Sequence, residues 1–537
     1  MMHLGKVALV GAGPGDIGLI TVRGMELLRQ ADCIVYDRLL NKDFLEITDP
    51  KCEKIYVGKE NHHHTLRQEE INELLFEKAG EYELVVRLKG GDPYVFGRGG
   101  EEARFLKNRG VPVEVIPGVT SSIAAAALAG IPVTHRGLSK GFLVITAHTE
   151  KDEINRIDYR ILTDEDVTLV FLMGLSHVED IAKGLVNAGR DIETPAAVIS
   201  NGTTADQKKC VGNLGNIAKM VKEADLPSPS VILVGKVAAL SGELDFFENR
   251  QLFGKKFFLP VIDKFRFEPG AGEKGHKQYG SSGYEVNELK SALTEKGAEV
   301  ISVVAGRISP VEFDVAIIDN VKAQDFLIFT SSSGVKAFLY NLFEIFGKDI
   351  RALPKCKIAV VGDKTARTLA CFGIRADYVA EKTTAADLAR ELARKYIVEE
   401  VDTDLTDVTE EASLKRDIYW FCGKRHSAGL EAEIPSGWSL RKVICYENIP
   451  KRPIVTEDER NKIFHCDGTI LTCGSNARFA CELIRDISGD PDQKSYSLPG
   501  EVYSIGPACT RILKEYQITG VRQAGISSYE GIIEMLV

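Results

Sequence analysis

The chain has 537 residues, too many for a single hydrophobic core, so we expect two to four domains. Its composition is 44% hydrophobic and 27% charged, which excludes fibrous and intrinsically disordered proteins. A formal net charge of −10 argues against nucleic acid or an anionic membrane as the main partner, and no apolar run is long enough to span a bilayer.

The cysteines and histidines predict no metal centre. The eleven cysteines are scattered without CxxC pairs or zinc-type spacing, so we expect reduced thiols. The adjacent residues His62, His63 and His64 would point in different directions, which favours a polar loop over a ligand set. Gly11–Asp16 interrupts the only apolar run near the start, which is not typical of a signal peptide. We therefore expect a cytoplasmic protein.

Apolar runs typical of strands alternate with helical patterns along almost the whole chain. Continuous apolar strands between helices predict an α/β fold, with mainly parallel sheets and helices on both faces. One complete set of strands ends before LDFFENRQLFGKK, residues 244–256, and another set begins after it. The major domain boundary is therefore predicted near residue 250.

The predicted strand at 7–10 runs into a glycine-rich turn, GAGPGD, at 11–16. A dinucleotide fingerprint GxGxxG that starts at Gly11 needs glycine at position 16, where the chain has Asp16. Pro14 lacks an N–H donor, and Asp16 adds negative charge where a pyrophosphate would bind. The turn is therefore predicted to bring backbone close to an uncharged or cationic ligand.

Two later loops have similar chemistry. In GGDPYVFGRGGEE, at 90–102, glycine and proline dominate, so backbone is the predicted contact surface. Asp92 could hydrogen-bond a hydroxyl or ammonium group there, or could simply belong to a turn. In PGVTSS, at 117–122, Thr120 or Ser121 can cap the small-residue helix that follows.

These motifs carry a resemblance. GAGPGD, YDRLL (36–40), VGK (57–59), GGDPYVFGRGGEE, PGVTSS, FLMG (171–174) and NGTTADQ (201–207) occur in the order found in tetrapyrrole methylases. Over residues 5 to about 245 the chain resembles this family, and within it the uroporphyrinogen-III C-methyltransferases. The resemblance implies an enzyme, without a metal, that uses S-adenosylmethionine to add two methyl groups to uroporphyrinogen III. The product would be precorrin-2, on the route to sirohaem or cobalamin.

The resemblance also implies site residues. The S-adenosylmethionine contacts would be Pro14, Gly90, Gly91, Asp92, Val95, Thr120, Ser121, Met173 and Gly202. Asp37, in YDRLL, matches the family's proposed proton acceptor, and Lys59, in VGK, matches its proposed proton donor. Asp37 could instead be a turn or cap residue, Lys59 a surface cation and Met173 a core filler.

The implied substrate carries eight carboxylates, and guanidinium groups pair with carboxylates in bidentate fashion. Basic residues within or beside the motifs could supply this pairing, and any one of them could equally be an ordinary surface cation. They are Arg38, Arg87, Lys89, Arg98 and Arg136.

The second half contains an internal repeat, with one copy at 326–393 and another at 469–536. Each copy is predicted as strand, Ser/Thr-rich turn, helix, strand, glycine turn and helix, and Gly362 aligns with Gly506. Two similar α/β lobes that face each other would form a cleft, where ligands often bind.

Residues from about 255 to 537 resemble uroporphyrinogen-III synthases, a two-lobed flavodoxin-like family. The resembling stretches are FTSSSGVKAF, AVVGDKTARTLACFGI, VICYENIP, LTCGSNA, SIGPACTRIL and ISSYEGI. The implied reaction closes linear hydroxymethylbilane into a ring with loss of water. Backbone N–H groups in Ser/Thr turns suit its carboxylates. Candidate substrate contacts in this half are Thr330, Ser331, Ser332, Thr472 and Ser475.

Tyr446, in VICYENIP, matches a family tyrosine proposed to assist loss of the hydroxyl group. Turn or packing duty alone is the alternative for Tyr446 and for the Ser/Thr residues. Two other functions stay open: a methylase acting later in corrin synthesis, and a second half that binds substrate without catalysis.

The domain organisation is predicted as three segments. The methylase would occupy 1–245, with lobes at about 1–118 and 119–245, and 246–256 would be a linker. The synthase-like part would occupy 257–537, with lobe one at about 257–305 plus 450–537 and lobe two at about 306–449. The methylase resemblance also implies a homodimer formed through the first half.

Overall fold

The computed structural model describes residues 4–38, 40–49, 51–58, 66–147, 157–265, 267, 288–380, 385–401, 416–425, 429–435, 437–488 and 496–537. The chain forms two compact units, of which the first includes residues 1–257 and the second includes 301–532. Among the described residues, no helix is both long and apolar enough to cross a bilayer.

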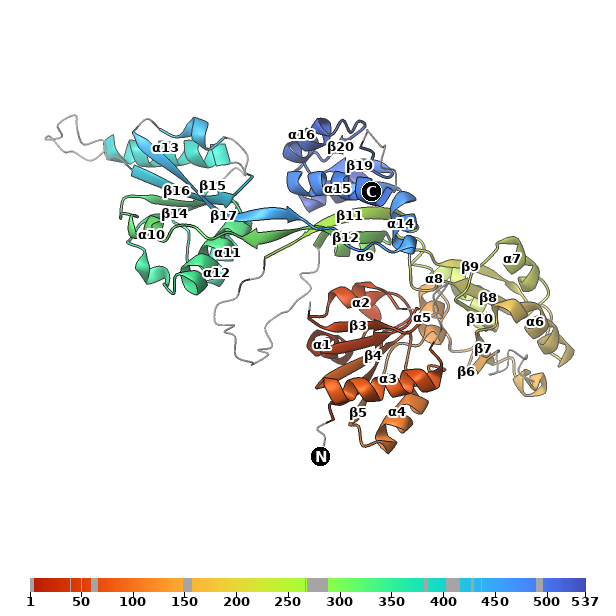
Figure 1. Ribbon diagram of the computed structural model, residues 1–537. Coiled ribbons are helices and arrows are strands. Elements are labelled where there is room, and N and C mark those ends of the chain that lie inside the picture. The colour runs from red at the N-terminus through yellow and green to blue at the C-terminus, as the bar shows by residue number, and fades with distance from the viewer. Residues whose placement is uncertain are drawn as a thin grey trace. The chain divides into compact units, whose positions relative to one another are not determined.

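The first unit contains two five-stranded sheets (Figure 1). All strands of the first sheet are parallel. In spatial order they are β3 (Glu53–Tyr56), β2 (Cys33–Tyr36), β4 (Leu84–Lys89), β1 (Lys6–Gly11) and β5 (Val113–Ile116). The helices of this part are η1 (Ile17–Leu19), α1 (Val22–Gln30), α2 (Asp43–Glu46), α3 (Gln68–Glu81) and α4 (Gly99–Asn108).

Helices cover both faces of the first sheet because its strands are apolar on both sides. Successive strand side chains point to opposite faces. Val10 of β1 belongs to the core formed with α1 and α2, whereas Leu9 belongs to the core formed with α3 and α4. The expected doubly covered α/β arrangement is confirmed here.

The second sheet of this unit is mixed. Its strands are β6 (Gly141–Thr146), β7 (Val167–Leu172), β10 (Ser230–Val234), β8 (Pro195–Ser200) and β9 (Lys208–Asn213), in spatial order. Its helices are α5 (Ser121–Leu128), η2 (Tyr159–Leu162), η3 (Leu175–His177), α6 (Val178–Asn187), α7 (Ile217–Glu223), η4 (Lys236–Leu240) and α8 (Ser241–Leu244). Only β6 and β7 run parallel; β10 is antiparallel to both of its neighbours, and β9 is antiparallel to β8. The expectation of mainly parallel sheets is wrong for this sheet, because a buried apolar strand has the same sequence pattern in either direction.

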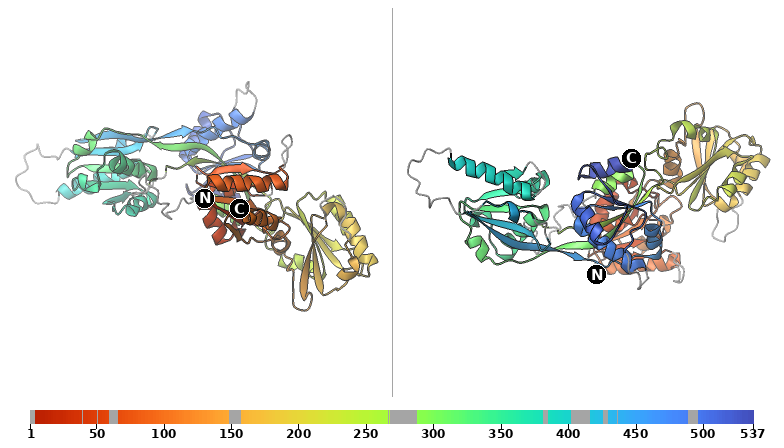
Figure 2. Two further views of the ribbon diagram at one scale, coloured as in Figure 1. Left: turned by 60° about the horizontal axis from the view of Figure 1, so that its bottom comes forward. Right: turned by 90° about the horizontal axis from the view of Figure 1, so that it is seen from above.

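A ten-stranded sheet runs through the rest of the chain. In spatial order its strands are β15 (Tyr378–Ala380), β14 (Lys357–Val361), β13 (Phe326–Phe329), β16 (Arg416–Gly423), β17 (Trp438–Pro450), β12 (Glu299–Pro310), β11 (Lys256–Asp263), β18 (Gly468–Leu471), β19 (Glu501–Ser504) and β20 (Arg522–Gln523). β12 and β17 pair antiparallel over 306–310 and 446–450, and they form the long ribbon in the middle of this sheet (Figure 2).

The predicted internal repeat is visible in the order of the elements. One copy is β13–α11–β14–α12 and the other is β18–α15–β19–α16; α12 and α16 begin directly after Gly362 and Gly506. The helices are α9 (Glu288–Glu295), α10 (Ala316–Asp319), α11 (Ser332–Tyr340), η5 (Asn341–Ile345), η6 (Ile350–Ala352), α12 (Asp363–Cys371), α13 (Ala385–Val401), η7 (Glu431–Glu433), α14 (Glu457–Phe464), α15 (Gly474–Ser488), α16 (Pro507–Glu515) and α17 (Tyr529–Leu536).

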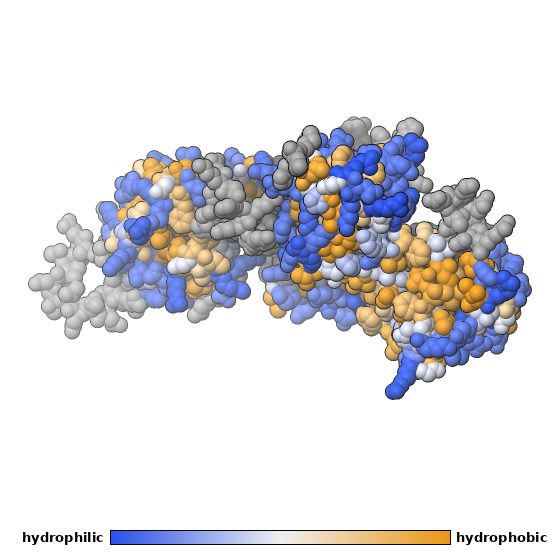
Figure 3. Space-filling model, turned by 90° about the horizontal axis from the view of Figure 1, so that it is seen from below, coloured by the Kyte–Doolittle hydropathy of each residue, from blue (hydrophilic) through white to orange (hydrophobic). Residues whose placement is uncertain are grey.

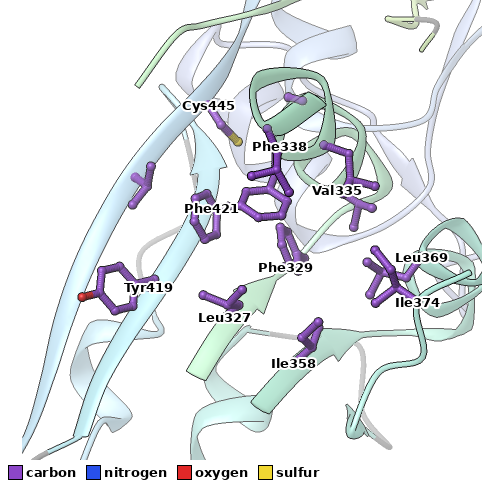
Figure 4. Close-up of a cluster of buried hydrophobic side chains, with 14 of the residues drawn as sticks. Leu327, Phe329, Val335, Phe338, Ile358, Leu369, Ile374, Tyr419, Phe421 and Cys445 are labelled. Carbon is purple, nitrogen blue, oxygen red and sulfur yellow. The ribbon is translucent and has the colours of Figure 1, made fainter. Parts of the chain in front are cut away.

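A buried aromatic cluster anchors the first copy of the repeat (Figure 4). Phe338 of α11 packs against Phe421 of β16 with ring centroids 4.5 Å apart, and Phe329 of β13 stacks on Phe421 at 5.4 Å. Cys445 of β17 lies in the same cluster. Tyr446, the next residue of β17, packs against the same cluster. The predicted linker 246–256 lies between α8 and β11, and the three-part division of the chain stays a prediction.

Candidate functional site

Three glycine-bearing loops meet at the carboxyl ends of β1, β4 and β5. Gly13 and Gly91 exchange backbone hydrogen bonds of 3.2 and 2.8 Å. A Cβ placed on Gly118 would lie 2.2 Å from the Gly91 carbonyl oxygen, and one on Gly11 would lie 2.6 Å from Gly118 Cα. Only glycine fits such approaches, so the loops pack backbone against backbone. We call residues 11–16, 90–98 and 117–121 the loop cluster.

Asp92 holds the loop cluster together. Its Oδ1 accepts from the backbone N–H of Tyr94 at 2.7 Å and of Val95 at 3.2 Å, while its Oδ2 accepts from Gly118 N at 2.9 Å. Both carboxylate oxygens are therefore engaged with backbone. The structure gives Asp92 the turn role that the sequence left open as an alternative.

Strained backbone is concentrated around these loops. Among the described residues, seven that are not glycine have positive φ. Five of them follow β4, β7 or β8, and they are Phe96 (54°), Arg98 (57°), Met173 (57°), Asn201 (48°) and Thr203 (74°). Such conformations cost free energy and tend to occur at functional sites. Met173 also keeps 51% of its surface exposed, so it is not a core filler.

The remaining predicted cofactor contacts lie on the same loops. Thr120 is the N-cap of α5 but makes no capping hydrogen bond; its hydroxyl lies 3.0 Å from that of Ser122. Gly202 approaches α5 so closely that a Cβ would lie 2.5 Å from Ala125 Cβ. The backbone N–H of Asp16 donates to Thr203 Oγ1 at 3.2 Å. Pro14, Gly90, Val95 and Ser121 complete the set on the loop cluster.

Asp37 directly follows β2. Its Oδ2 accepts from Nη2 of Arg87 at 3.2 Å, and its side chain is 30% exposed. Arg38 beside it is exposed. Lys59 and the three histidines His62–His64 lie outside the described residues. Of these two predicted proton-transfer residues, the structure therefore describes only Asp37. It lies at the end of β2, in the same sheet as the strands that lead into the loop cluster.

Two of the cations expected to pair with substrate carboxylates are buried. Arg87 is 3% exposed and Lys89 is 5% exposed, and both donate to Glu102 of α4, which is completely buried. The expectation that Arg87 and Lys89 bind substrate is wrong, because an internal carboxylate already pairs them. Glu102 was missed by the sequence analysis, although two basic residues at alternate positions of an apolar strand signal a buried counter-charge.

A second polar group lies just after the end of β13 and beside the end of β16, where Tyr446 of β17 is opposite Gly423. The hydroxyls of Ser331 and Tyr446 are 3.2 Å apart, and Ser331 Oγ also accepts from Gly334 N at the start of α11. A Cβ on Gly423 would lie 2.7 Å from the Tyr446 ring, so the ring packs directly against strand backbone. Burial raises the pKa of Tyr446, and the Ser331 hydrogen bond opposes this effect only partly. The phenol therefore stays protonated at neutral pH.

The other predicted Ser/Thr residues of this half differ in their hydrogen-bond partners. Ser475, at the start of α15, accepts from Asn448 Nδ2 at 2.8 Å. Asn448 lies two positions after Tyr446 on β17, so both side chains share one face of the strand; the sequence analysis did not identify it. Thr330 accepts from the Trp420 indole at 3.2 Å. Ser332 donates to Lys364 O at 3.4 Å, and Thr472 N donates to Asn476 Oδ1 at 3.1 Å.

All eleven cysteines are free thiols in the structure. Within the described part of the chain, no group of three or more His, Cys, Asp or Glu side chains is arranged to hold a metal ion.

The sequence matches two family models. Residues 6–218 match "Tetrapyrrole (Corrin/Porphyrin) Methylases", and residues 287–534 match "Uroporphyrinogen-III synthase HemD". The uroporphyrinogen-III C-methyltransferase of Methanocaldococcus jannaschii is 49% identical over 235 residues, which cover 43% of this chain and 96% of that protein. The chain belongs to the tetrapyrrole methylases.

The similarity of this tetrapyrrole methylase extends beyond its first half. The porphyrin biosynthesis protein HemD of Ruminiclostridium josui is 38% identical over 397 residues, 73% of this chain and 75% of that protein. A solved structure of the Thermus thermophilus uroporphyrin-III C-methyl transferase, complexed with S-adenyl homocysteine, is 41% identical. It covers 44% of this chain and 100% of that one, with a TM-score of 0.39.

Proposed function

We propose that the first half of the chain transfers two methyl groups from S-adenosylmethionine to uroporphyrinogen III, which gives precorrin-2. The observation that carries this proposal is the loop cluster, where backbone rather than side chains forms the surface at the ends of β1 and β4. A Cβ added to Gly91 would meet only the Thr120–Ser121 backbone, at 3.9 Å, so a flat group can approach there. The donor supplies an activated methyl group on a cationic sulfonium.

Asp37 is the proposed proton acceptor of this reaction. Addition of a methyl group to an electron-rich pyrrole carbon leaves positive charge on the ring, and a proton must then leave. A carboxylate near that ring stabilises the charge and accepts the proton. Asp37 stands at the end of β2 with one oxygen held by Arg87, which orients it. Lys59 is the proposed proton donor, by resemblance to the family. Met173 and Gly202 are proposed cofactor contacts.

We propose that the second half closes hydroxymethylbilane to uroporphyrinogen III. The Tyr446 phenol, next to Ser331, would donate a proton to the departing hydroxyl so that it leaves as water. Ser/Thr turns at the starts of α11 and α15 would bind carboxylates through backbone N–H groups. In the first half, Arg38 is the proposed cation that pairs with the carboxylates of uroporphyrinogen III.

Incubation of the full-length protein with hydroxymethylbilane and S-adenosylmethionine tests both halves. We expect mass spectrometry to detect the addition of two methyl groups, and chromatographic separation of the isomers to identify the III series. Unmethylated III isomer would contradict the methylase proposal. Because spontaneous closure gives the I isomer, formation of I isomer alone would instead show a second half that only binds its substrate.

We further propose that the protein works in the cytoplasm as a homodimer formed through the first half. Its free thiols support that compartment. β6 is an edge strand with exposed Phe142 and Leu143, and Figure 3 shows apolar side chains gathered over this part of the molecule. Exposed apolar edges are common at interfaces. Light scattering should give the dimer mass for the wild type and the monomer mass for Leu143→Glu; a monomeric wild type would contradict the proposal.

A further inference from the structure

Three buried charged residues, Arg87, Lys89 and Glu102, form a cluster with Asp37, the proposed proton acceptor, whose side chain is 30% exposed. Arg87 and Lys89 are two positions apart on β4, so their side chains lie on the same face of the strand. Glu102 projects from α4, and Asp37 follows β2. Burial of an unpaired charge costs free energy, so buried charged groups are normally held in ion pairs and hydrogen bonds. Two cations and two carboxylates balance the formal charge of the cluster.

The contacts join Glu102 to Asp37 through a single guanidinium. Glu102 Oε1 accepts from Lys89 Nζ at 3.0 Å, from Arg87 Nε at 3.3 Å and from Gln68 Nε2 at 3.2 Å. Arg87 Nη1 donates to the Val35 and Leu88 carbonyls at 3.3 and 3.2 Å, and its Nη2 donates to Asp37 Oδ2 at 3.2 Å. Every guanidinium nitrogen of Arg87 is engaged, so the plane of the group is fixed between α4 and Asp37.

We propose that Glu102 is a positioning residue for the methyl-transfer site, which acts on Asp37 through Arg87. This inference rests on the proposed function of Asp37. The Glu102 carboxylate pairs with both Arg87 and Lys89. Without that carboxylate, Asp37 would be the only acidic partner of two neighbouring buried cations. Arg87, which already donates to Asp37 Oδ2 at 3.2 Å, would then pair with that carboxylate more strongly, and Asp37 would accept the ring proton less readily.

The test compares Glu102→Gln with the wild type in the full-length protein. Glutamine preserves the shape and removes the charge. We expect kcat for methylation to fall about 10- to 100-fold, as for other small misplacements of a catalytic group. The affinity for S-adenosylhomocysteine, measured by calorimetry, should stay within about twofold, because the loop cluster is untouched. Glu53→Gln is the matched control: Glu53, on neighbouring β3, pairs with Lys78 at 3.1 Å and should tolerate the change.

Two results would overturn the inference. One is an unchanged kcat in Glu102→Gln. The other is an equal loss of kcat and S-adenosylhomocysteine affinity, which would indicate general disruption of the fold. If Glu102 has a merely structural role, Glu102→Gln should reduce the methylation rate by the same factor in an Asp37→Asn background, measured in single turnovers. Action through Asp37 predicts less than about a twofold further loss there. If Asp37→Asn itself methylates at the wild-type rate, the proposed role of Asp37 fails; if it is impaired and Glu102→Gln is not, only the present inference fails.

Discussion

The hydroxyl groups of Ser331 and Tyr446 lie 3.2 Å apart, although 115 positions separate the two residues in the chain. Ser331 begins α11, and Tyr446 lies in the ribbon strand β17 that leads to the second copy of the repeat. The pair therefore stands where the two copies of the repeat connect. This position suits a group that protonates the leaving hydroxyl of a large substrate.

Removal of that phenol should separate the two activities. In Tyr446→Phe, we expect formation of the III isomer to slow about 100-fold or more, because a general acid contributes roughly that factor. Methylation of added uroporphyrinogen III should be unchanged. Chromatographic separation of the I and III isomers provides the measurement. Tyr419→Phe is the control, since it removes another phenol of the same unit, bonded to Asn320 O at 3.3 Å. A III-isomer rate like that of the wild type in Tyr446→Phe would contradict the role.

A methyl group added at Gly118 should disrupt the loop cluster. The new Cβ would lie 2.2 Å from Gly91 O and 2.7 Å from Gly11 Cα, and neither backbone atom can move aside cheaply. We expect Gly118→Ala to lose about 1–3 kcal/mol of unfolding free energy in urea and to lose measurable S-adenosylhomocysteine binding. In Gly100→Ala, on α4, the added Cβ meets no atom within 4 Å, so stability and binding should be preserved. Equal behaviour of the two variants would show that the close approach is unimportant.

Replacement of Met173 by glycine should stabilise the fold but weaken binding of the methyl donor. Its φ of 57° is unfavourable for a residue with a side chain, and half of its surface is exposed. We expect Met173→Gly to raise the unfolding free energy by about 1 kcal/mol and to weaken S-adenosylmethionine binding. Asp225→Gly, at a φ of 46° away from the loop cluster, should be stabilised without any change in methylation. A Met173→Gly enzyme with wild-type KM for the methyl donor would exclude Met173 from the site.

The ion pairs of Glu114 should make stability depend on pH. Hydrogen bonds from Lys6 and Arg23 lower the pKa of Glu114 in the folded state. The unfolded chain therefore binds the proton more tightly. The stabilisation is complete above the ordinary glutamate pKa of about 4.3 and is lost as the pH falls through the folded-state value. Urea unfolding of the wild type between pH about 6 and 3 should lose stability more steeply than Glu114→Gln; parallel curves would contradict this linkage.

The three loops of the loop cluster could be predicted from the sequence because backbone dominates their contacts. Glycine and proline at fixed spacings identify turns, and GAGPGD, GGDP and PGVTSS proved to lie on three loops that meet. The role of Asp92 could not be predicted, since a carboxylate at a strand end can bind either a ligand or the N–H groups of a neighbouring loop. Only the fold brings Gly118 N within 2.9 Å of it.

The synthase-like site was less predictable because its polar groups come from distant segments. Ser331 and Tyr446 were both candidates, yet nothing in either local pattern indicates that they touch. Asn448 went unnoticed because an asparagine in an apolar strand has no motif of its own. Its partner Ser475 is identified only once α15 is in place.

The sequence by itself determined the α/β class and the internal repeat, because apolar periodicity and turn residues are local properties. Its motifs carried the resemblance to the family. The tertiary structure decided which charged residues are buried and with which residues they pair. Arg87 and Lys89 look like surface cations in the sequence, but in the fold α4 places Glu102 against them, and all three are buried. Tertiary structure also decided the antiparallel direction of β10. The physical reason is the same in both cases: the environment of a charge and the direction of a buried strand depend on partners from elsewhere in the chain.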